Sequence, residues 1–162
     1  MPKLIIIRGN SGSGKSTVAG IVRDNAKSDT ALINQDYVRR TILRDNSDDH
    51  AQTAELINQI VLAILAQGYN VVLEGVLSKN RYSKMLRNLV EAYPSYVYYI
   101  NVTLKETLKR HQTKPIANQV SENKILGWYI EKDILGVENE KVIGEDSSIS
   151  QSVKFILINS GL

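Results

Sequence analysis

The sequence of 162 residues contains no cysteine, only three prolines and only two histidines. The absence of cysteine excludes disulfide bonds, thiolate metal sites and thiol catalysis. Two histidines give little basis for a metal cluster. Because glycine and proline are few, at ten and three residues, the chain is neither collagen-like nor of low complexity. An ordinary folded protein is therefore expected.

Long hydrophobic runs and a strong net charge are also missing. The N-terminal apolar run covers residues 4–7 and is far too short for a signal-peptide core or a membrane span. With the lack of cysteine, this favours a cytoplasmic protein and no membrane partner. The formal net charge of +3 is too small to require nucleic acid, and a phosphorylated small molecule suits it equally. The length predicts one domain over residues 1–162.

Apolar residues alternate along the chain between unbroken short runs and stripes with helical spacing. The runs predict buried parallel strands, and the stripes predict helices packed on a sheet. Because parallel strands need long, right-handed crossovers, this order predicts an α/β fold in three layers. The expected strands are 4–7, 31–33, 70–73, 96–102 (as a central strand) and 141–143; the expected helices begin at Lys15, cover 52–67, include Tyr82 to Leu89, and include Leu104 and Leu108.

One motif lies between the first expected strand and the first expected helix. It matches at every position the phosphate-loop pattern of glycine, four residues, and Gly-Lys-Ser or Gly-Lys-Thr. Such a loop turns backbone N–H groups toward a polyphosphate. Lys15 is expected to reach the β- and γ-phosphates, Ser16 to bind Mg²⁺, and Thr17 to contact the α-phosphate. The predicted nucleotide-binding residues are Gly9, Asn10, Ser11, Gly12, Ser13, Gly14, Lys15, Ser16 and Thr17.

A dinucleotide-binding loop is the alternative for the same glycines. The run Gly12-Ser13-Gly14 begins its fingerprint, and Asp36 follows at a suitable distance. The fingerprint fails at Thr17, where a third small residue is required. Lys15 would also put a cation into a helix turn meant for close packing. The pattern therefore favours the phosphate loop.

Asp36 follows the second expected strand at its carboxyl end, where open α/β sheets place their ligand crevice. A carboxylate there can accept the proton of a hydroxyl group that attacks phosphorus, so Asp36 is the predicted general base. The alternative is an N-cap for the helix expected through Val38 to Leu43, and both roles can hold together. Arg39 and Arg40 follow, and one of them shares a helical face with Asp36. Arg39 is predicted to be that arginine and to hold an anionic or polyhydroxyl acceptor bidentately, with a solvated surface charge as the alternative.

Glu74 closes the third expected strand beside Gly75, which permits close approach of other groups. It stands where a carboxylate usually helps to hold Mg²⁺ through water, although aspartate is the more familiar residue at such a strand end. Glu74 is therefore predicted to serve either the metal or the acceptor.

The polar segment 112–123 predicts a lid, and the residues that lead into it are cationic. A lid can bring a cation onto the transferring phosphoryl group and exclude water. Arg110 is predicted to do this as a catalytic residue, with Lys114 as a second cation that contacts the substrate. The alternative is a helix C-terminus whose cations favour its dipole. His111 is expected at the surface, and Trp128 in the core or in lid packing.

Three cations, Arg81, Lys84 and Arg87, step by three along the helix expected after the third strand. Such a stripe could follow a polyanion, but it is more typical of a solvated helix face.

These residues resemble a group of small P-loop kinases that includes polynucleotide 5′-kinase, chloramphenicol phosphotransferase and the zeta toxins. The resemblance rests on the loop at 9–17, on Asp36, Arg39 and Glu74, and more loosely on Arg110, and it covers most of the chain. It implies ATP with Mg²⁺ as the donor, a P-loop NTPase fold with five parallel strands in the order 2-3-1-4-5, Asp36 as base and Arg39 as acceptor contact. The sequence is much shorter than zeta toxins and has no part that corresponds to the phosphatase domain of some polynucleotide kinases, so no substrate is carried over.

The expected function is transfer of the γ-phosphoryl group of ATP to a hydroxyl group of a small molecule such as a nucleoside, a sugar or an antibiotic. Two alternatives stay open. One is a nucleic-acid 5′-end kinase, for which the basic stripe would be the groove. The other is a nucleotide-dependent switch with no acceptor. The sequence leaves open the acceptor, the choice between ATP and GTP, and the oligomeric state.

Overall fold

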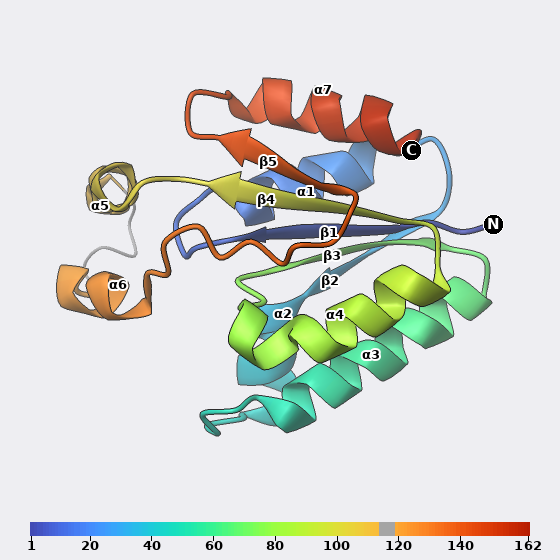
Figure 1. Cartoon of the computed structure of the whole chain (residues 1–162), viewed down its shortest axis with the longest axis horizontal. Coiled ribbons are helices and arrows are strands. Elements are labelled where there is room, and N and C mark those ends of the chain that lie inside the picture. The colour runs from blue at the N-terminus through green and yellow to red at the C-terminus, as the bar shows by residue number, and fades with distance from the viewer. Residues whose placement is uncertain (114–118) are drawn as a thin grey trace.

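One parallel sheet forms the middle layer of the structure (Figure 1). The computed structural model describes residues 1–113 and 119–162. The strands run side by side in the order 2-3-1-4-5, so the predicted α/β class and strand order are confirmed. The strands are β1 (Leu4–Gly9), β2 (Thr30–Asn34), β3 (Asn70–Gly75), β4 (Ser95–Asn101) and β5 (Glu140–Gly144).

Strand β1 lies at the centre of the sheet, between β3 and β4. Its residues alternate between the two faces, so Leu4 and Ile6 join one apolar cluster while Ile5 and Ile7 join the other. The segment expected as the central strand, 96–102, corresponds to β4, which is interior but lies between β1 and β5. The central strand is therefore the one that leads directly into the glycine-rich turn.

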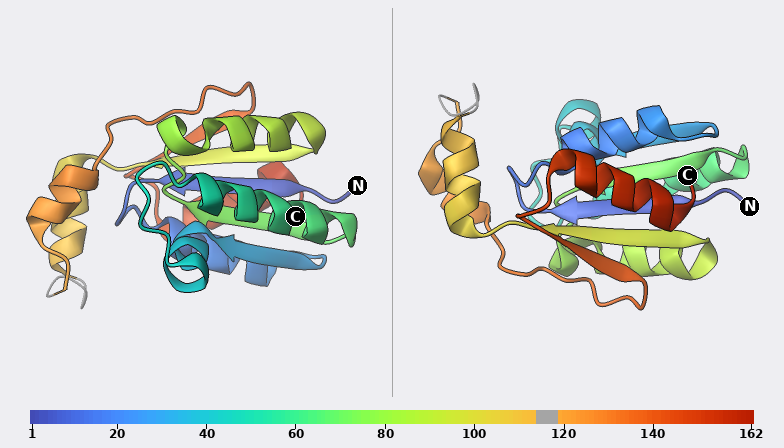
Figure 2. Two further views of the ribbon diagram at one scale, coloured as in Figure 1. Left: turned by 90° about the horizontal axis from the view of Figure 1, so that it is seen from below. Right: turned by 90° about the horizontal axis from the view of Figure 1, so that it is seen from above.

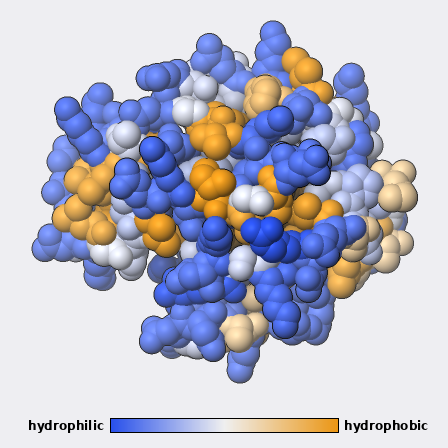
Figure 3. Space-filling model, viewed as in Figure 1, coloured by the Kyte–Doolittle hydropathy of each residue, from blue (hydrophilic) through white to orange (hydrophobic). Residues whose placement is uncertain are grey.

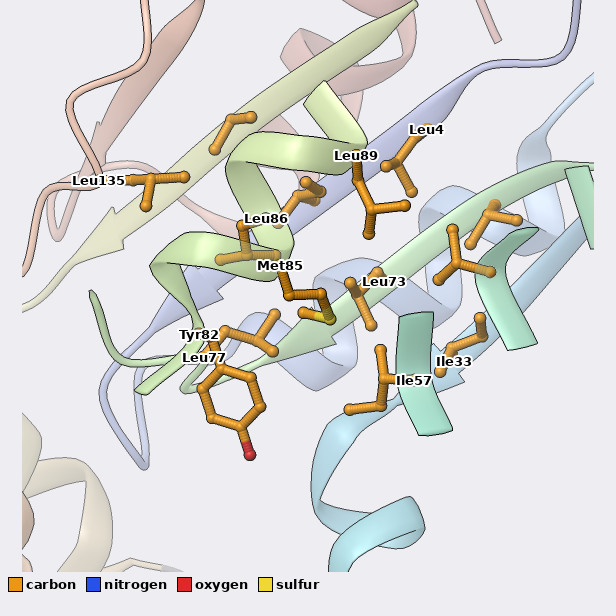
Figure 4. Close-up of a cluster of buried hydrophobic side chains, with 14 of the residues drawn as sticks. Leu4, Ile33, Ile57, Leu73, Leu77, Tyr82, Met85, Leu86, Leu89 and Leu135 are labelled. Carbon is orange, nitrogen blue, oxygen red and sulfur yellow. The ribbon is translucent and has the colours of Figure 1, made fainter. Parts of the chain in front are cut away.

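Helices cover both faces of the sheet, as Figures 1 and 2 show. Helices α1 and α7 contact each other on one face, and α3 and α4 contact each other on the opposite face. Figure 4 shows the cluster beneath α4, where apolar side chains of that helix meet those of β1 and β3. The helices are α1 (Lys15–Asn25), α2 (Gln35–Tyr37), the π-helix η1 (Val38–Leu43), α3 (Ala51–Ala66), α4 (Lys79–Ala92), α5 (Leu104–Gln112), α6 (Glu122–Trp128) and α7 (Ile149–Ser160).

Helices α5 and α6 project beyond the carboxyl ends of the strands (Figure 2). Hydrophobic side chains gather on the surface on this side of the molecule (Figure 3). Within α6, Leu126 and Trp128 remain 45% and 44% exposed. Trp128 therefore lies at the surface and not in the core, which was one of the two places expected for it; packing in the lid stays a prediction. None of the helices in the described ranges has the length and apolar content that crossing a bilayer requires.

The turn after β2 differs from the helix expected there. The side chain of Asn34 accepts a hydrogen bond from the backbone N–H of Tyr37 at 2.7 Å, so Asn34 caps α2. Asp36 lies within the first turn of α2 and is not the N-cap. The expected helix through Val38 to Leu43 is present as η1, whose wider π turn follows α2 directly.

Arg8, the second-last residue of β1, is fully buried. Its Nη2 lies 2.9 Å from Asp133 and its Nη1 lies 3.1 Å from Glu140, while its Nε donates to the carbonyl oxygen of Leu77 at 3.1 Å. Its guanidinium carbon lies 5.6 Å from the ring centroid of Tyr99. A buried cation needs such partners, because desolvation of the charge is otherwise uncompensated. Arg8 thus ties the segment between α6 and β5 to the end of the central strand.

Replacement of Arg8 by methionine is expected to lower the free energy of unfolding by about 3–5 kcal/mol, because Asp133 and Glu140 lose their shared cation in a buried place. Urea denaturation measures the change. Arg23→Met is the matched control, since Arg23 pairs with Asp24 on an exposed helix face. A loss for Arg8→Met no larger than that of the control would contradict this account.

Candidate active site

The turn between β1 and α1 has the geometry of an anion-binding loop. Gly12 and Gly14 adopt φ angles of 80° and 90°, a left-handed region that side-chain-bearing residues rarely enter. The backbone N–H of Ser13 donates to the carbonyl of Asn10 at 3.1 Å, which closes the turn. Helix α1 then begins at Lys15, so the positive end of its dipole faces the same loop. The turn can therefore hold a polyphosphate.

Lys15 lies across this loop. Its side chain is 8% exposed overall, and its Nζ donates to the carbonyl oxygen of Asn10 at 3.3 Å. A lysine held over the turn adds a point charge to the backbone N–H groups.

Asn10 uses its side chain elsewhere. Its Nδ2 donates to the carbonyl oxygen of Ile130 at 2.7 Å, and its Oδ1 accepts from the N–H of Ile130 at 3.0 Å. Both ends of the amide are thus occupied by one residue after α6, across 120 positions of sequence. Asn10 can offer only its backbone to a bound phosphate, and its side chain fastens the loop to the segment that follows α6.

A cavity of about 660 Å³, the first cavity, opens beside the loop. It brings together residues that the sequence analysis selected from three separate strand ends and one helix turn. Two loop residues, an acid, an arginine and a second acid line it: Lys15, Ser16, Asp36, Arg39 and Glu74. The carboxyl ends of parallel strands lie at one edge of the sheet, which explains this convergence.

Glu74 lies deepest among these residues, at 2% exposure. The amide of Asn34 donates to its Oε1, while its Oε2 is buried with no hydrogen-bond partner in residues 1–113 and 119–162. Burial raises the pKa of the Glu74 carboxyl group, and the charge of Lys15 and the nearby hydroxyl group of Ser16 act in the opposite direction. An unpartnered carboxylate oxygen beside a serine hydroxyl suits a hard cation such as Mg²⁺.

Asp36 is paired with Arg40. The Nε of Arg40 lies 2.7 Å from Oδ1 of Asp36, and its guanidinium carbon lies 5.8 Å from the ring centroid of Trp128. Arg40 is thus the arginine that shares a face with the carboxylate. Arg39 lines the same cavity, with its Nη2 at a long 3.5 Å from the carbonyl oxygen of Ser47.

Arg110 lies on the other side of the phosphate loop. It donates to the carbonyl oxygens of Ser13 and Glu145, both at 3.3 Å, and pairs with Glu106 at 2.9 Å. It lines a second cavity of about 450 Å³, which Thr17 also lines. The structure does not bring Arg110 together with Asp36, although Gly12 lies in both cavities. The two cavities therefore meet at the loop.

The lid expected at 112–123 is described only in part, and Lys114 lies outside the described residues. His111, expected at the surface, is buried at 5% exposure. Its Nε2 lies 2.6 Å from the carbonyl oxygen of Val120, so it connects the end of α5 to the start of α6.

Sequence reasoning missed a polar group in the wall of the first cavity. His50 is 8% exposed, and its Nδ1 lies 2.9 Å from the hydroxyl of Tyr82. The amide of Gln35 donates to the same hydroxyl at 3.2 Å. Burial lowers the pKa of His50, and the charges of Arg39 and Arg81 lower it further. No periodicity marks His50, and only its rarity in the sequence could have drawn attention to it.

Residues 4–126 match the model of a family described as AAA domain. No curated protein matches the chain in sequence. Among solved structures, the chain is similar to a sugar kinase from Janibacter sp. HTCC2649, with a TM-score of 0.72 and 18% identity over 98% of this chain and 94% of that one.

Two further structures are similar to the same extent. A gluconokinase from Sinorhizobium meliloti 1021 has a TM-score of 0.72 and 17% identity over 99% of this chain and 92% of its own. The Mycobacterium tuberculosis APS kinase CysC, in complex with AMPPNP and APS, has a TM-score of 0.73 and 17% identity over 98% of this chain and 96% of its own. At such identities the likeness shows the fold, which is that of the P-loop NTPases.

The lowered pKa of His50 predicts a pH effect on stability. The native protein favours the neutral imidazole of His50. The contribution of His50 to the free energy of unfolding is therefore complete at pH values above the ordinary histidine pKa of 6.5, and it is lost as the pH falls below this value. His50→Asn should remove this loss of stability at low pH. Asparagine is chosen because it tolerates the left-handed backbone at this position, where φ is 55°. Urea midpoints between pH 7.5 and 5.5 should therefore fall more steeply for the wild type than for His50→Asn. Equal slopes, or a steeper fall in the variant, would contradict the prediction.

Proposed function

The chain belongs to the AAA domain family, and from this membership and the site we propose that it is a kinase. It transfers the γ-phosphoryl group of ATP to a hydroxyl group of a small molecule. One observation carries the proposal: the first cavity joins the phosphate loop, with Lys15 and Ser16, to a carboxylate and an arginine at neighbouring strand ends. A protein that only bound or hydrolysed nucleotide would not need a second set of polar groups in the cavity beside the loop.

The nucleotide is held by the loop and extends into the second cavity. Backbone N–H groups of the loop and Lys15 bind the phosphates. Thr17 and Arg110 line the second cavity, which has room for the nucleoside end at about 450 Å³. A catalytic contact of Arg110 with the transferred phosphoryl group stays a prediction. In the described arrangement, Arg110 would hold the nucleotide from the side of the loop opposite Asp36.

Ser16 and Glu74 would hold Mg²⁺. In the described residues no three side chains of His, Asp or Glu are grouped to bind a metal, so a bound ion would rely on the Ser16 hydroxyl, Glu74 and the phosphates themselves. When bound, Mg²⁺ neutralises charge on the phosphate oxygens and orients them. The unpartnered Oε2 of Glu74 supports this assignment.

Asp36 is the proposed general base. Its carboxylate accepts the proton of the acceptor hydroxyl as that oxygen attacks the phosphorus atom, and Arg40 orients the carboxylate through its hydrogen bond. Arg39 contacts the acceptor from η1. Phosphoryl transfer requires little covalent work from the protein, so positioning of the two substrates and charge neutralisation supply most of the acceleration.

A small acceptor fits better than a nucleic-acid end. Arg87, the last member of the basic stripe, is half-buried and donates to the carbonyl oxygen of Leu135, so it is not part of an open basic face. Arg81 lines the first cavity, and Lys84 does not. We also propose that residues 1–162 act as one kinase domain with a lid at 112–123, and that α6, which begins at the end of this segment, covers the first cavity, since Trp128 lines it.

Asp36→Asn should lower acceptor-dependent ADP release by about 10²- to 10⁴-fold, because the variant cannot accept the hydroxyl proton. The measurement is a screen of nucleosides, sugars, sugar acids and aminoglycoside or phenicol antibiotics with ATP and Mg²⁺. Asp24→Asn, on the exposed face of α1, is the control. The kinase proposal fails if no acceptor raises ADP release, or if the Asp36 variant equals the wild type.

Lys15→Ala should weaken ATP binding by about 10- to 100-fold, the effect of losing one hydrogen bond to a charged group. Isothermal titration with AMPPNP and Mg²⁺ measures it. Asp36→Asn should leave this affinity unchanged, which separates nucleotide binding from transfer. Unchanged affinity in Lys15→Ala would show that the loop does not hold the phosphates.

A further inference from the structure

One wall of the first cavity consists of residues that the proposed reaction does not use. His50 precedes α3, Arg81 and Tyr82 belong to α4, and Gln35 begins α2; all of them line the cavity together with Arg39. Figure 4 shows the ring of Tyr82 against the apolar cluster with its hydroxyl pointing away from it. This hydroxyl is the point at which Gln35 and His50 meet.

The hydrogen bonds around Tyr82 fix the position of the proton on His50. Gln35 donates its amide N–H to the Tyr82 oxygen at 3.2 Å. A phenolic oxygen that already accepts one hydrogen bond directs its own proton to the nearest acceptor, and Nδ1 of His50 lies 2.9 Å away. In this arrangement Nδ1 is the acceptor, and we infer that the neutral imidazole carries its proton on Nε2.

Gly75 holds Gln35 in this position. A Cβ atom at Gly75 would lie 2.6 Å from the Cβ of Gln35, so no larger residue fits beside it. The orientation of His50 is thus set by three elements, β3, α2 and α4. Such support is typical of a side chain that has to present one particular atom.

The wall offers hydrogen-bond donors to the cavity. His50 lines the cavity, and the hydrogen bond recorded for its ring is the one that Nδ1 makes with Tyr82, so Nε2 is the ring nitrogen left for a ligand. The Nε of Arg39 is buried and lacks a hydrogen-bond partner in the described part of the chain. Arg81 uses its Nε to bind the carbonyl oxygen of Asp48, which leaves the outer nitrogens of its guanidinium group for a ligand.

The acids that line the cavity do not neutralise this wall. Asp36 is paired with Arg40, and Glu74 is bound by Asn34 on the side of the phosphate loop. Asp48 is exposed, and its contact with Arg81 is through the backbone carbonyl. Arg39, Arg81 and His50 therefore line the same space, and no ion pair within the described residues joins any of them to a carboxylate; such a group of donors suits an oxyanion.

We propose that Arg39, Arg81 and the Nε2–H of His50 form a subsite for an anionic group of the acceptor. The inference rests on the proposed function and narrows its substrate: the acceptor is a hydroxyl compound that carries a carboxylate or a phosphate ester, and not a neutral sugar, nucleoside or antibiotic. Tyr82 and Gln35 are positioning residues, since they act through His50.

Binding of matched pairs of compounds tests the subsite. The chain has one tryptophan, Trp128, and it lines the first cavity, so its fluorescence reports occupancy. The probes are gluconate against sorbitol and glycerol 3-phosphate against glycerol, with AMPPNP and Mg²⁺ present at saturation so that the phosphate loop is filled. At least one anionic probe should bind at least 10-fold more tightly than its neutral counterpart. A difference in affinity within the gluconate and sorbitol pair would indicate a subsite for a carboxylate. A difference within the glycerol 3-phosphate and glycerol pair would indicate a subsite for a phosphate ester.

Variants localise the effect. Arg81→Ala should weaken binding of the anionic probe at least 10-fold, while Lys84→Ala, which removes a cation of the same helix outside the cavity, should not. The proposal is wrong if no anionic probe binds more tightly than its neutral counterpart, or if the two variants have equal effects.

A second measurement addresses His50 directly. The chain has two histidines, so ¹⁵N-labelled imidazoles give two resolved sets of NMR signals, with His111 as an internal reference. At pH 7.5 His50 should be neutral with its proton on Nε2. Tyr82→Phe keeps the ring but removes the hydroxyl, so it should mix the tautomers of His50 and weaken the anionic probe severalfold without affecting the neutral one. A proton on Nδ1 in the wild type would overturn the proposal.

These tests separate the subsite from the kinase activity. If phosphoryl transfer is equally efficient with a neutral acceptor and with its anionic counterpart, the subsite proposal is refuted and the kinase proposal still stands. Preferential binding of an anionic probe, with no acceptor that raises ADP release, would refute the kinase and leave the subsite.

Discussion

The site depends on the burial of β1 on both faces. Four consecutive apolar residues, 4–7, are fully covered by helices on either side of the sheet, and a strand covered in this way pairs with parallel neighbours. Parallel pairing brings the carboxyl ends of β1, β2 and β3 to one edge, with Gly9 and Gly75 at the ends of two of them. The phosphate loop, Asp36 and Glu74 meet there because the sheet ends there, and not because they attract one another.

Local patterns were sufficient for the five strands, for most of the helices and for the loop, but the helix α7 (Ile149–Ser160) was not expected. Unbroken apolar runs located all five strands to within two residues at most of their ends, and the glycine-lysine spacing located the phosphate loop between a strand and a helix. Asp36, Arg39 and Glu74 could be chosen because each follows or ends a strand. Their lining of one cavity agrees with that choice, while their chemical roles stay predictions.

Other features depend on partners that are distant in sequence, which periodicity does not reveal. Arg8 looks like the polar end of a strand, yet its carboxylate partners lie 125 and 132 residues further on. His50 and Tyr82 are 32 residues apart, and the sequence around a histidine in a polar segment does not indicate that its side chain will contact a tyrosine. The pairing of Asp36 with Arg40 has the four-residue spacing of an ordinary helical ion pair, whereas the π-helix that carries Arg40 is a local geometry that these residues do not indicate.

The two hydrogen bonds between Asn10 and Ile130 join the phosphate loop to the segment that follows α6. Ile130, in that segment, lines the first cavity. A movement of α6 that widened the first cavity would have to break both bonds or move the Asn10 side chain as well. Two such bonds contribute about 1–3 kcal/mol in net terms. Breaking both bonds would therefore also release the side-chain link that fastens the phosphate loop.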